Sequence, residues 1–182
     1  MQFQSFLVRV AVFCLASLML IGCNLEEFEE EFDTEFTVPK PTEKLFGAQV
    51  HTQAKRFKME NDPQDAEHVE FLDASLTVLA PDGHDLSFMN KLDVFVCKSI
   101  EFDDCKDPDN GNLLLLATAD EFSPGDTKRA LDISYSGDLR GFSKDQRILL
   151  TWIVYPSSWY SWPESGITIQ TNVRLLVELD LL

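Results

Sequence analysis

The last part of the chain carries its clearest structural signal, an alternation of apolar and polar side chains from Ile167 to Leu181. Because successive side chains of a β-strand point to opposite faces, this period of two predicts a long strand with one buried face. The buried face should carry Ile167, Ile169, Thr171, Val173, Leu175, Val177 and Leu179, and the solvent face Thr168, Gln170, Asn172, Arg174, Glu178 and Asp180. The segment therefore indicates a sheet with one wet side.

The same periodicity recurs along the chain, and turn signals such as Pro81-Asp82-Gly83 and Asn110-Gly111 separate the apolar segments. The expected strands are residues 32–38, 46–53, 69–80, 92–97, 113–118, 131–135, 147–155 and 167–181. About eight strands without a convincing helix predict an all-β fold, a two-layer antiparallel β-sandwich of immunoglobulin-like type, with a small barrel as the alternative. Two connections, residues 85–88 and 138–142, each place a Leu and a Phe before an apolar strand, where they should plug an end of the core.

The amino-terminal segment has the organisation of a signal peptide, with Arg9 before an apolar stretch from Val10 to Ile21. A membrane-spanning helix needs about 20 apolar residues, so this shorter stretch is not expected to be a permanent span. Leu20-Ile21-Gly22-Cys23 match the lipobox of bacterial lipoproteins. The chain thus resembles a bacterial lipoprotein with a type II signal peptide, and its layout is similar to that of small β-sandwich lipoproteins of bacterial envelopes.

This resemblance implies cleavage between Gly22 and Cys23, a diacylglycerol on the Cys23 sulfur and acylation of the new amino terminus. Several acyl chains hold a protein durably on a membrane where one chain does not. Asn24, rather than Asp, follows the cysteine, which is similar to the pattern that permits transfer to the outer membrane in lipoproteins of enteric bacteria. The expected location is the bacterial cell envelope, at the outer membrane, with the domain facing the periplasm or the surface.

The sequence divides into a signal peptide at residues 1–22, the lipidated cysteine with an acidic tether running into the first strand at 23–44, and the sandwich at 45–182. The acids of residues 24–31 should keep the tether extended. Loss of Arg9 with the leader takes the formal net charge from −16 to −17. A surface this acidic disfavours nucleic acid and repels anionic lipid headgroups, so contact with the bilayer should come from the acyl chains.

Cys97 and Cys105 remain after Cys14 leaves with the leader and Cys23 is lipidated. An even pair in an oxidising compartment predicts a disulfide, and a zinc site is the less favoured alternative because no histidine lies nearby in the sequence. The acidic loop between and after them holds Asp103, Asp104, Asp107 and Asp109 without the spacing of an EF-hand. A calcium loop of another kind stays open as the alternative to a solvated loop.

Catalytic motifs are missing from the sequence. His51, His68 and His84 lie far apart without helical or hairpin spacing, and no Gly-x-Ser-x-Gly segment accompanies them. Glycine loops that bind phosphate or a dinucleotide are also missing. We therefore expect surface histidines and a protein that is not an enzyme, with no cofactor beyond the covalent lipid on Cys23.

Aromatic residues gather before the final strand, at Tyr155, Trp159, Tyr160 and Trp162. Exposed aromatic rings mark binding surfaces because they stack on sugars and fill pockets in protein partners. In the alternative interpretation Trp152 is core, and Trp159 and Trp162 fold back as a lid over one end of the sandwich. The expected function is a structural or protein-interaction module with an envelope protein as partner, and the alternative is a carbohydrate-binding module that uses residues 155–162 on a glycan.

Overall fold

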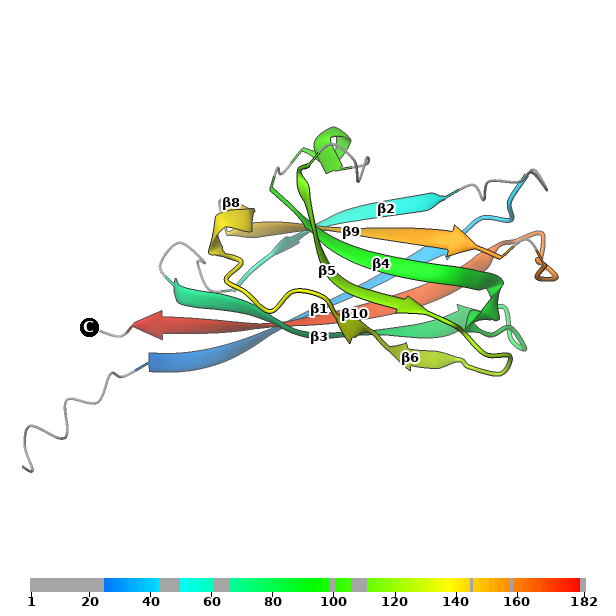
Figure 1. The fold of residues 1–182 in the computed structure, drawn as a ribbon, viewed down its shortest axis with the longest axis horizontal. Coiled ribbons are helices and arrows are strands. Elements are labelled where there is room, and N and C mark those ends of the chain that lie inside the picture. Colours follow the sequence, from blue (N-terminus) through cyan, green and yellow to red (C-terminus); the bar gives the residue numbers. More distant parts are fainter. Residues whose placement is uncertain are drawn as a thin grey trace, which may run out of the picture.

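The structure is a computed structural model that describes residues 25–42, 50–60, 66–98, 101–105, 111–144, 146–157 and 159–180. Its strands form two antiparallel sheets that pack face to face (Figure 1). Sheet A contains, in spatial order, β1 (Leu25–Val38), β10 (Ile167–Asp180), β3 (Ala66–Ala80) and β6 (Lys128–Ala130). Sheet B contains β2 (His51–Lys58), β9 (Arg147–Pro156), β4 (Met89–Cys97), β5 (Leu113–Asp120) and β7 (Asp132–Ile133), and β8 (Ser143–Lys144) pairs with β9. The predicted all-β, two-layer antiparallel sandwich is confirmed.

The strand order is that of a jelly roll. The first strand β1 pairs with the last strand β10, β2 pairs with β9, β3 with β6, and β4 with β5. This arrangement of nested pairs in two sheets corresponds to jelly rolls, whereas an immunoglobulin domain keeps its first two strands in one sheet. The immunoglobulin-like detail of the prediction is therefore corrected, because a period of two shows which face of a strand is buried but not which strand lies beside it.

The core lies between the inner faces of the two sheets, with Trp152 fully buried at its centre. The rings of Phe36 and Phe57 each lie 6.1 Å from the Trp152 ring, centroid to centroid. The two predicted plugs are confirmed: Leu86 and Phe88 are fully buried in the short 3-10 helix η1 (Leu86–Phe88), and Leu139 is fully buried before η4 (Arg140–Phe142), where the half-buried Phe142 also packs against the core.

A β-bulge explains why β3 buries residues of both odd and even number. Leu175 of β10 lies opposite Phe71 and Arg174 lies opposite Asp73, so Leu72 has no partner in the ladder. The extra residue reverses the alternation. Val69 and Phe71 face the core before the bulge, and Ala74 and Leu76 face it afterwards. In β10 the predicted alternation is confirmed without interruption, and its buried face begins at Ile167.

The predicted acidic tether is wrong for residues 25–31. They form the first half of β1, which pairs with β10 from Leu25 opposite Asp180 onward. The acids at 27, 29 and 31 point outward, and Arg174 of β10 offsets their charge, with its Nη1 3.2 Å from Glu29 Oε2. Glu30 points inward and is buried, and its carboxylate accepts a hydrogen bond from the backbone of Glu60 at 3.0 Å. Neighbouring strands thus supply the partners that a charged sequence cannot supply to itself.

Two further strand predictions need correction. The chain does not form one strand over 131–135, because it passes from β6 in sheet A to β7 in sheet B with Leu131 buried between them. β2 continues to Lys58, beyond the predicted end at Gln53, and the predicted residues 46–49 lie outside the described part of the chain.

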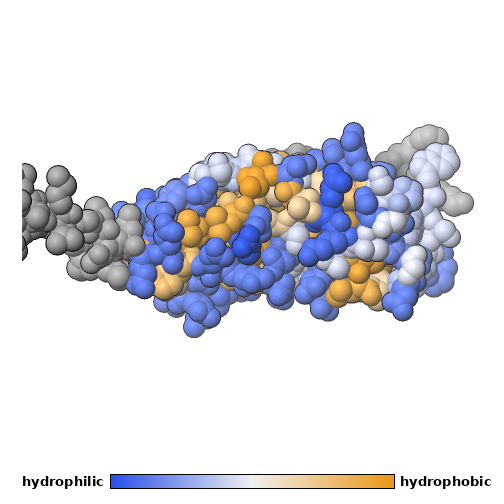
Figure 2. Space-filling view, turned by 90° about the horizontal axis from the view of Figure 1, so that it is seen from below, coloured by the Kyte–Doolittle hydropathy of each residue, from blue (hydrophilic) through white to orange (hydrophobic). Residues whose placement is uncertain are grey.

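The outer faces of the sheets differ in what covers them. The view from below in Figure 2 is mostly hydrophilic, with an apolar band crossing part of it. On sheet B, by contrast, Leu149, Thr151 and Ile153 of β9 point away from the core and are nevertheless buried.

Among the described residues, the structure has no helix with the length and hydropathy needed to cross a bilayer.

Candidate functional site

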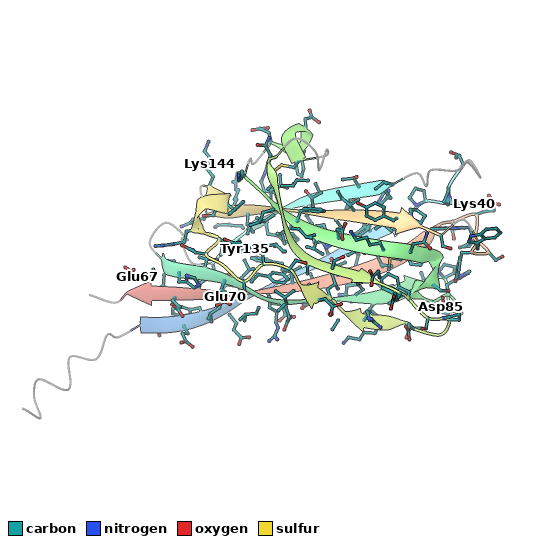
Figure 3. All side chains as sticks on the ribbon, in the orientation of Figure 1. Lys40, Glu67, Glu70, Asp85, Tyr135 and Lys144 are labelled. Atoms are coloured by element: carbon teal, nitrogen blue, oxygen red, sulfur yellow. A yellow bond between two sulfur atoms is a disulfide. The ribbon has the colours of Figure 1, made fainter. Side chains whose placement is uncertain are left out.

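Strands β1, β3, β5 and β9 end, and β2, β4, β6 and β10 begin, at one end of the sandwich, which we name the loop end. The opposite, basal end is where β1 begins and β10 ends. Figure 3 shows Lys40 and Asp85 at the loop end and Glu67 and Lys144 at the basal end. The predicted aromatic residues of the last connection belong to the loop end.

Residues 157–166, named here the aromatic connection, separate their aromatic side chains into two groups. Trp159 is 95% exposed. Tyr160 and Trp162 are half-buried against Phe88, with ring centroids 6.3 Å and 5.3 Å from the Phe88 ring. The lid interpretation therefore holds for Trp162 and not for Trp159, and Trp152 is core as that interpretation states. Tyr155 lies apart on β9, with Lys91 Nζ 5.5 Å from its ring centroid.

Hydrogen bonds hold the first part of the aromatic connection, from Ser157 to Trp162. The Ser157 amide donates to the Phe88 carbonyl at 2.7 Å, and Trp162 Nε1 donates to the Ser157 carbonyl at 3.0 Å. Tyr160 Oη accepts a hydrogen bond from the Asp85 amide at 3.3 Å and lies 2.8 Å from His84 Nδ1. The exposed indole of Trp159 is thus displayed from a segment whose neighbouring side chains are packed and hydrogen-bonded.

Asp85 joins this segment to the connection between β5 and β6. Its carboxylate accepts hydrogen bonds from the Ser87 amide at 3.0 Å, at the start of η1, and from the Gly125 amide at 2.7 Å. Partial burial acts to raise the pKa of Asp85, but the hydrogen bonds from Ser87 and Gly125 outweigh it and the pKa is lowered. For Tyr160, burial raises the pKa, and the nearby Asp85 charge adds to the increase. The two groups are therefore held as a carboxylate and a neutral phenol.

A groove of about 630 Å³ lies beside the aromatic connection. Its walls are Thr37, residues 39–42, His51 and residues 164–166. Lys40 and Glu164 form an ion pair across these two segments. Gly166 holds them close: its φ is +74°, and a Cβ at that position would lie 2.5 Å from the Val38 carbonyl oxygen. The groove has the size of a small-molecule site, and hydroxyl and charged groups supply much of its lining.

His51 stands at the inner side of the groove, with its ring 5.9 Å from the Phe36 ring, centroid to centroid. Burial lowers the pKa of His51. Its Nε2 is buried without a hydrogen-bond partner in the part of the chain that the structure describes. The imidazole is therefore neutral at physiological pH and packs as an aromatic ring.

The histidines do not form one cluster. His51 is on β2, His84 contacts Tyr160, and His68 on β3 lies 3.8 Å from Glu70 and 3.9 Å from Asp138, nitrogen to oxygen. No group of three or more His, Cys, Asp or Glu among the described residues could hold a metal ion. Of the calcium candidates, Asp103 is exposed in η2 (Phe102–Cys105), the backbone of Asp104 follows it, and Asp107 and Asp109 lie outside the described residues.

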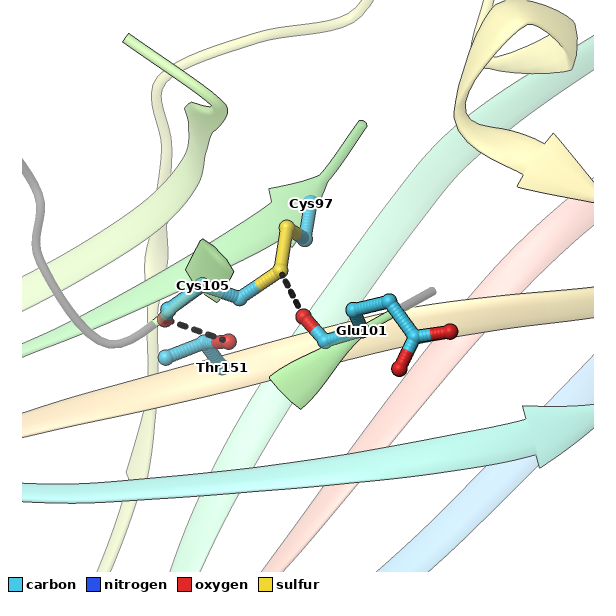
Figure 4. The surroundings of a disulfide bond; sticks show 4 residues. All are labelled: Cys97, Glu101, Cys105 and Thr151. Carbon is cyan, nitrogen blue, oxygen red and sulfur yellow. Dashed lines mark hydrogen bonds between the residues drawn. A yellow bond between two sulfur atoms is a disulfide. The ribbon is translucent and has the colours of Figure 1, made fainter. Parts of the chain in front are cut away.

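The predicted disulfide is confirmed between Cys97 and Cys105, whose Cα atoms are 5.9 Å apart (Figure 4). It fixes η2 over the outer face of sheet B. Thr151 Oγ1 donates to the Cys105 carbonyl at 3.4 Å, and both cysteines pack against Leu149 in a small apolar cluster. The insertion therefore explains part of the burial on the outside of sheet B. The cleavage and lipidation residues Gly22 and Cys23 lie outside the described residues.

The sequence did not point to the groove. Its two walls come from segments 124 residues apart, at Lys40 and Glu164, and the pairing of the first strand with the last brings them together. The only sequence feature that marks the two walls is their content of turn residues, at Pro39 to Pro41 and at Pro163 to Gly166. Turn residues predict connections but do not predict which connections lie side by side.

No protein-family profile matches the chain, and no curated protein matches it. Among solved structures, the chain is similar to the decameric BFDV capsid protein, with a TM-score of 0.45, 15% identity, and coverage of 85% of this chain and 99% of that chain. The 60-mer form of the BFDV capsid protein gives a TM-score of 0.44, 14% identity and coverage of 86% and 94%. VP2 of infectious bursal disease virus gives 0.35, 12%, and coverage of 86% of this chain and 33% of that chain.

Proposed function

We propose that this protein is a lipoprotein of the bacterial cell envelope, anchored through Cys23, whose non-catalytic jelly roll binds an envelope protein at its loop end. The Leu20-Ile21-Gly22-Cys23 segment supports the anchor. The Cys97–Cys105 disulfide fits an exported protein, because disulfides persist in oxidising compartments. Asn24 after the cysteine favours the outer membrane.

Trp159 is the observation that supports a binding role for the loop end. An indole exposed to this extent gains little from folding, yet Tyr160 and Trp162, which follow it in the same connection, are packed against Phe88. Tryptophan is among the residues that contribute most to protein interfaces when a partner buries it. Because packing and hydrogen bonds already hold the aromatic connection, it should lose less conformational entropy when a partner binds.

A photo-crosslinking amino acid at position 159, introduced into the lipidated protein in its own membranes, tests the binding role. We expect a discrete crosslinked product that a crosslinker at Ile133 does not form, since Ile133 is 50% exposed on β7 and away from the aromatic connection. Identical products from both positions would contradict a site at Trp159.

Intact-mass measurement of the same preparation tests the anchor, because an unmodified full-length chain would contradict lipidation at Cys23.

Glycan binding is the second candidate, and the groove beside the aromatic connection favours it. Sugars are recognised by an aromatic face together with hydrogen-bonding groups, and Thr37, Thr42 and Ser165 supply hydroxyls next to the Lys40–Glu164 ion pair. Retention on insoluble cell-wall polysaccharide that is lost in Trp159→Ala and in Glu164→Gln, but kept in Ile133→Ala, would support this function. Equal retention of all three variants would argue against it.

A further inference from the structure

Three cations lie side by side on the outer face of sheet B at the basal end. Arg147, the first residue of β9, pairs with Lys58 of β2 on one side and with Lys144 of β8 on the other. Directly opposite residues on neighbouring strands have Cβ atoms about 5 Å apart and point to the same face. The side chains of Lys58, Arg147 and Lys144, named here the cationic row, are all exposed.

The row places three like charges on neighbouring strands. Like charges placed directly opposite each other destabilise a sheet. Two other cations have acidic partners: Arg140 pairs with Asp138 at 2.7 Å, and Arg174, in the middle of β10, pairs with Asp73 and Glu29. Within the described residues, none of the three cations of the row forms an ion pair. Three neighbouring cations that form no ion pair in the described part of a chain with a net charge of −16 point to an anionic surface outside the fold.

The row lies at the end of the molecule from which the anchor would emerge. Glu26 of β1, Leu179 of β10 and Ala66 of β3 lie side by side in sheet A, and Arg140 Nη1 donates to the Ala66 carbonyl at 3.2 Å. This contact places η4 and the following β8 at the basal end, where Figure 3 shows Lys144. One residue, Asn24, separates Cys23 from β1. At about 3.5 Å per residue, so short a connection holds the basal end within roughly 10 Å of the lipidated sulfur.

We propose that the cationic row binds anionic phospholipid headgroups of the membrane in which Cys23 is anchored, so that the loop end with Trp159 faces away from the bilayer. This inference rests on the proposed lipidation of Cys23. The outward-pointing acids of β1, Glu27, Glu29 and Glu31, do not cancel the attraction, because they lie on the outer face of the other sheet. Packed sheets are about 10 Å apart, and at physiological salt charges separated by more than about 8 Å are largely screened.

Lysine footprinting on the natural lipidated protein tests the orientation. The protein is placed in vesicles of phosphatidylcholine alone or with phosphatidylglycerol, and a water-soluble acylating reagent is followed at each lysine by mass spectrometry. We expect acylation of Lys58 and Lys144 to slow about fivefold on the anionic vesicles, the effect of one cation's attraction to such a surface, and to recover in high salt. Lys128, which is exposed on β6 of the other sheet, is the internal control and should react equally on both.

Arg147→Gln removes the central charge and should reduce the protection of both lysines, whereas Lys128→Gln should not. Equal acylation of Lys58 and Lys144 on both vesicles, with lipid present on Cys23 by intact mass, would overturn the cationic row and leave the anchor standing. A chain without lipid would overturn both. Equal protection by soluble glycerol phosphate on neutral vesicles would assign the row to free anions and overturn the membrane contact.

Discussion

The aromatic connection and the cysteine insertion between β4 and β5 both cover part of the sandwich, but they are held by different means. The aromatic connection packs Tyr160 and Trp162 against Phe88, which belongs to the main core. The insertion lies on an outer face, where its described residues join a small buried cluster around Leu149. It is closed by the Cys97–Cys105 disulfide. A connection over an open end can join the core, whereas one over an outer face has little apolar surface to join and uses a covalent bond.

Truncating one phenylalanine in each region should give the largest difference between them. Phe88→Ala should lower the free energy of unfolding by about 3–5 kcal/mol, because Phe88 is fully buried and supports Tyr160 and Trp162. Phe102→Ala, the matched change in the insertion, should cost less than about 1 kcal/mol, since Phe102 is partly exposed and contacts the Arg56 guanidinium. Denaturant unfolding measures both, and equal losses would show that the insertion is part of the core.

Removing the disulfide should have the next largest effect. Cys97→Ser with Cys105→Ser should lower the free energy of unfolding by about 2.5 kcal/mol, as expected for a closed loop of this length in the chain-entropy model. Hydrogen exchange should rise in η2 and stay unchanged in the aromatic connection, which has no covalent closure. A similar rise in both regions would contradict their independence.

Substituting two glycines that have the same backbone angle should distinguish the cost of backbone strain from the cost of a steric clash. Gly166 in the aromatic connection and Gly111 at the end of the insertion both have a φ of +74°. An added Cβ meets open space at Gly111 and the Val38 carbonyl at Gly166. Gly111→Ala should therefore cost about 1 kcal/mol from backbone strain alone, and Gly166→Ala about 2 kcal/mol or more. The melting temperatures of the two variants check this. Equal decreases in melting temperature would show that the close approach of Gly166 to β1 does not add to the cost of the substitution.

The sequence predicted local properties of the chain and missed those that depend on pairing. Period two located β10 and its buried face, and the Leu and Phe of residues 85–88 correctly indicated a core plug. The first half of β1 was misassigned because its acids are compensated by Arg174, which lies on the neighbouring strand. The order of the strands, and with it the groove between Lys40 and Glu164, depends on contacts between distant segments that no local pattern records.

Net charge is likewise a property of composition that does not record where the charges lie in the fold. An overall charge of −16 predicts repulsion from anionic lipid, but the strand register collects Lys58, Arg147 and Lys144 at one place. The predicted aromatic loop lies between β9 and β10, but residue type does not show that Tyr160 and Trp162 turn toward Phe88 while Trp159 turns outward. Whether each ring is packed or exposed depends on where Phe88 lies in the folded sandwich, which residue type does not show.

The smallest effect on stability should come from Trp159→Ala. Because the indole is 95% exposed, its removal should change the free energy of unfolding by no more than about 0.5 kcal/mol, measured beside Trp162→Ala, which should be clearly destabilised by loss of its packing on Phe88. The proposed partner binding should nevertheless be lost. A variant that folds stably but does not bind would show that the two tryptophans have different roles, since Trp162 packs against Phe88 and Trp159 is the side chain proposed to contact the partner. If Trp159→Ala unfolds as readily as Trp162→Ala, the side chain supports the fold, and the binding role assigned to it is wrong.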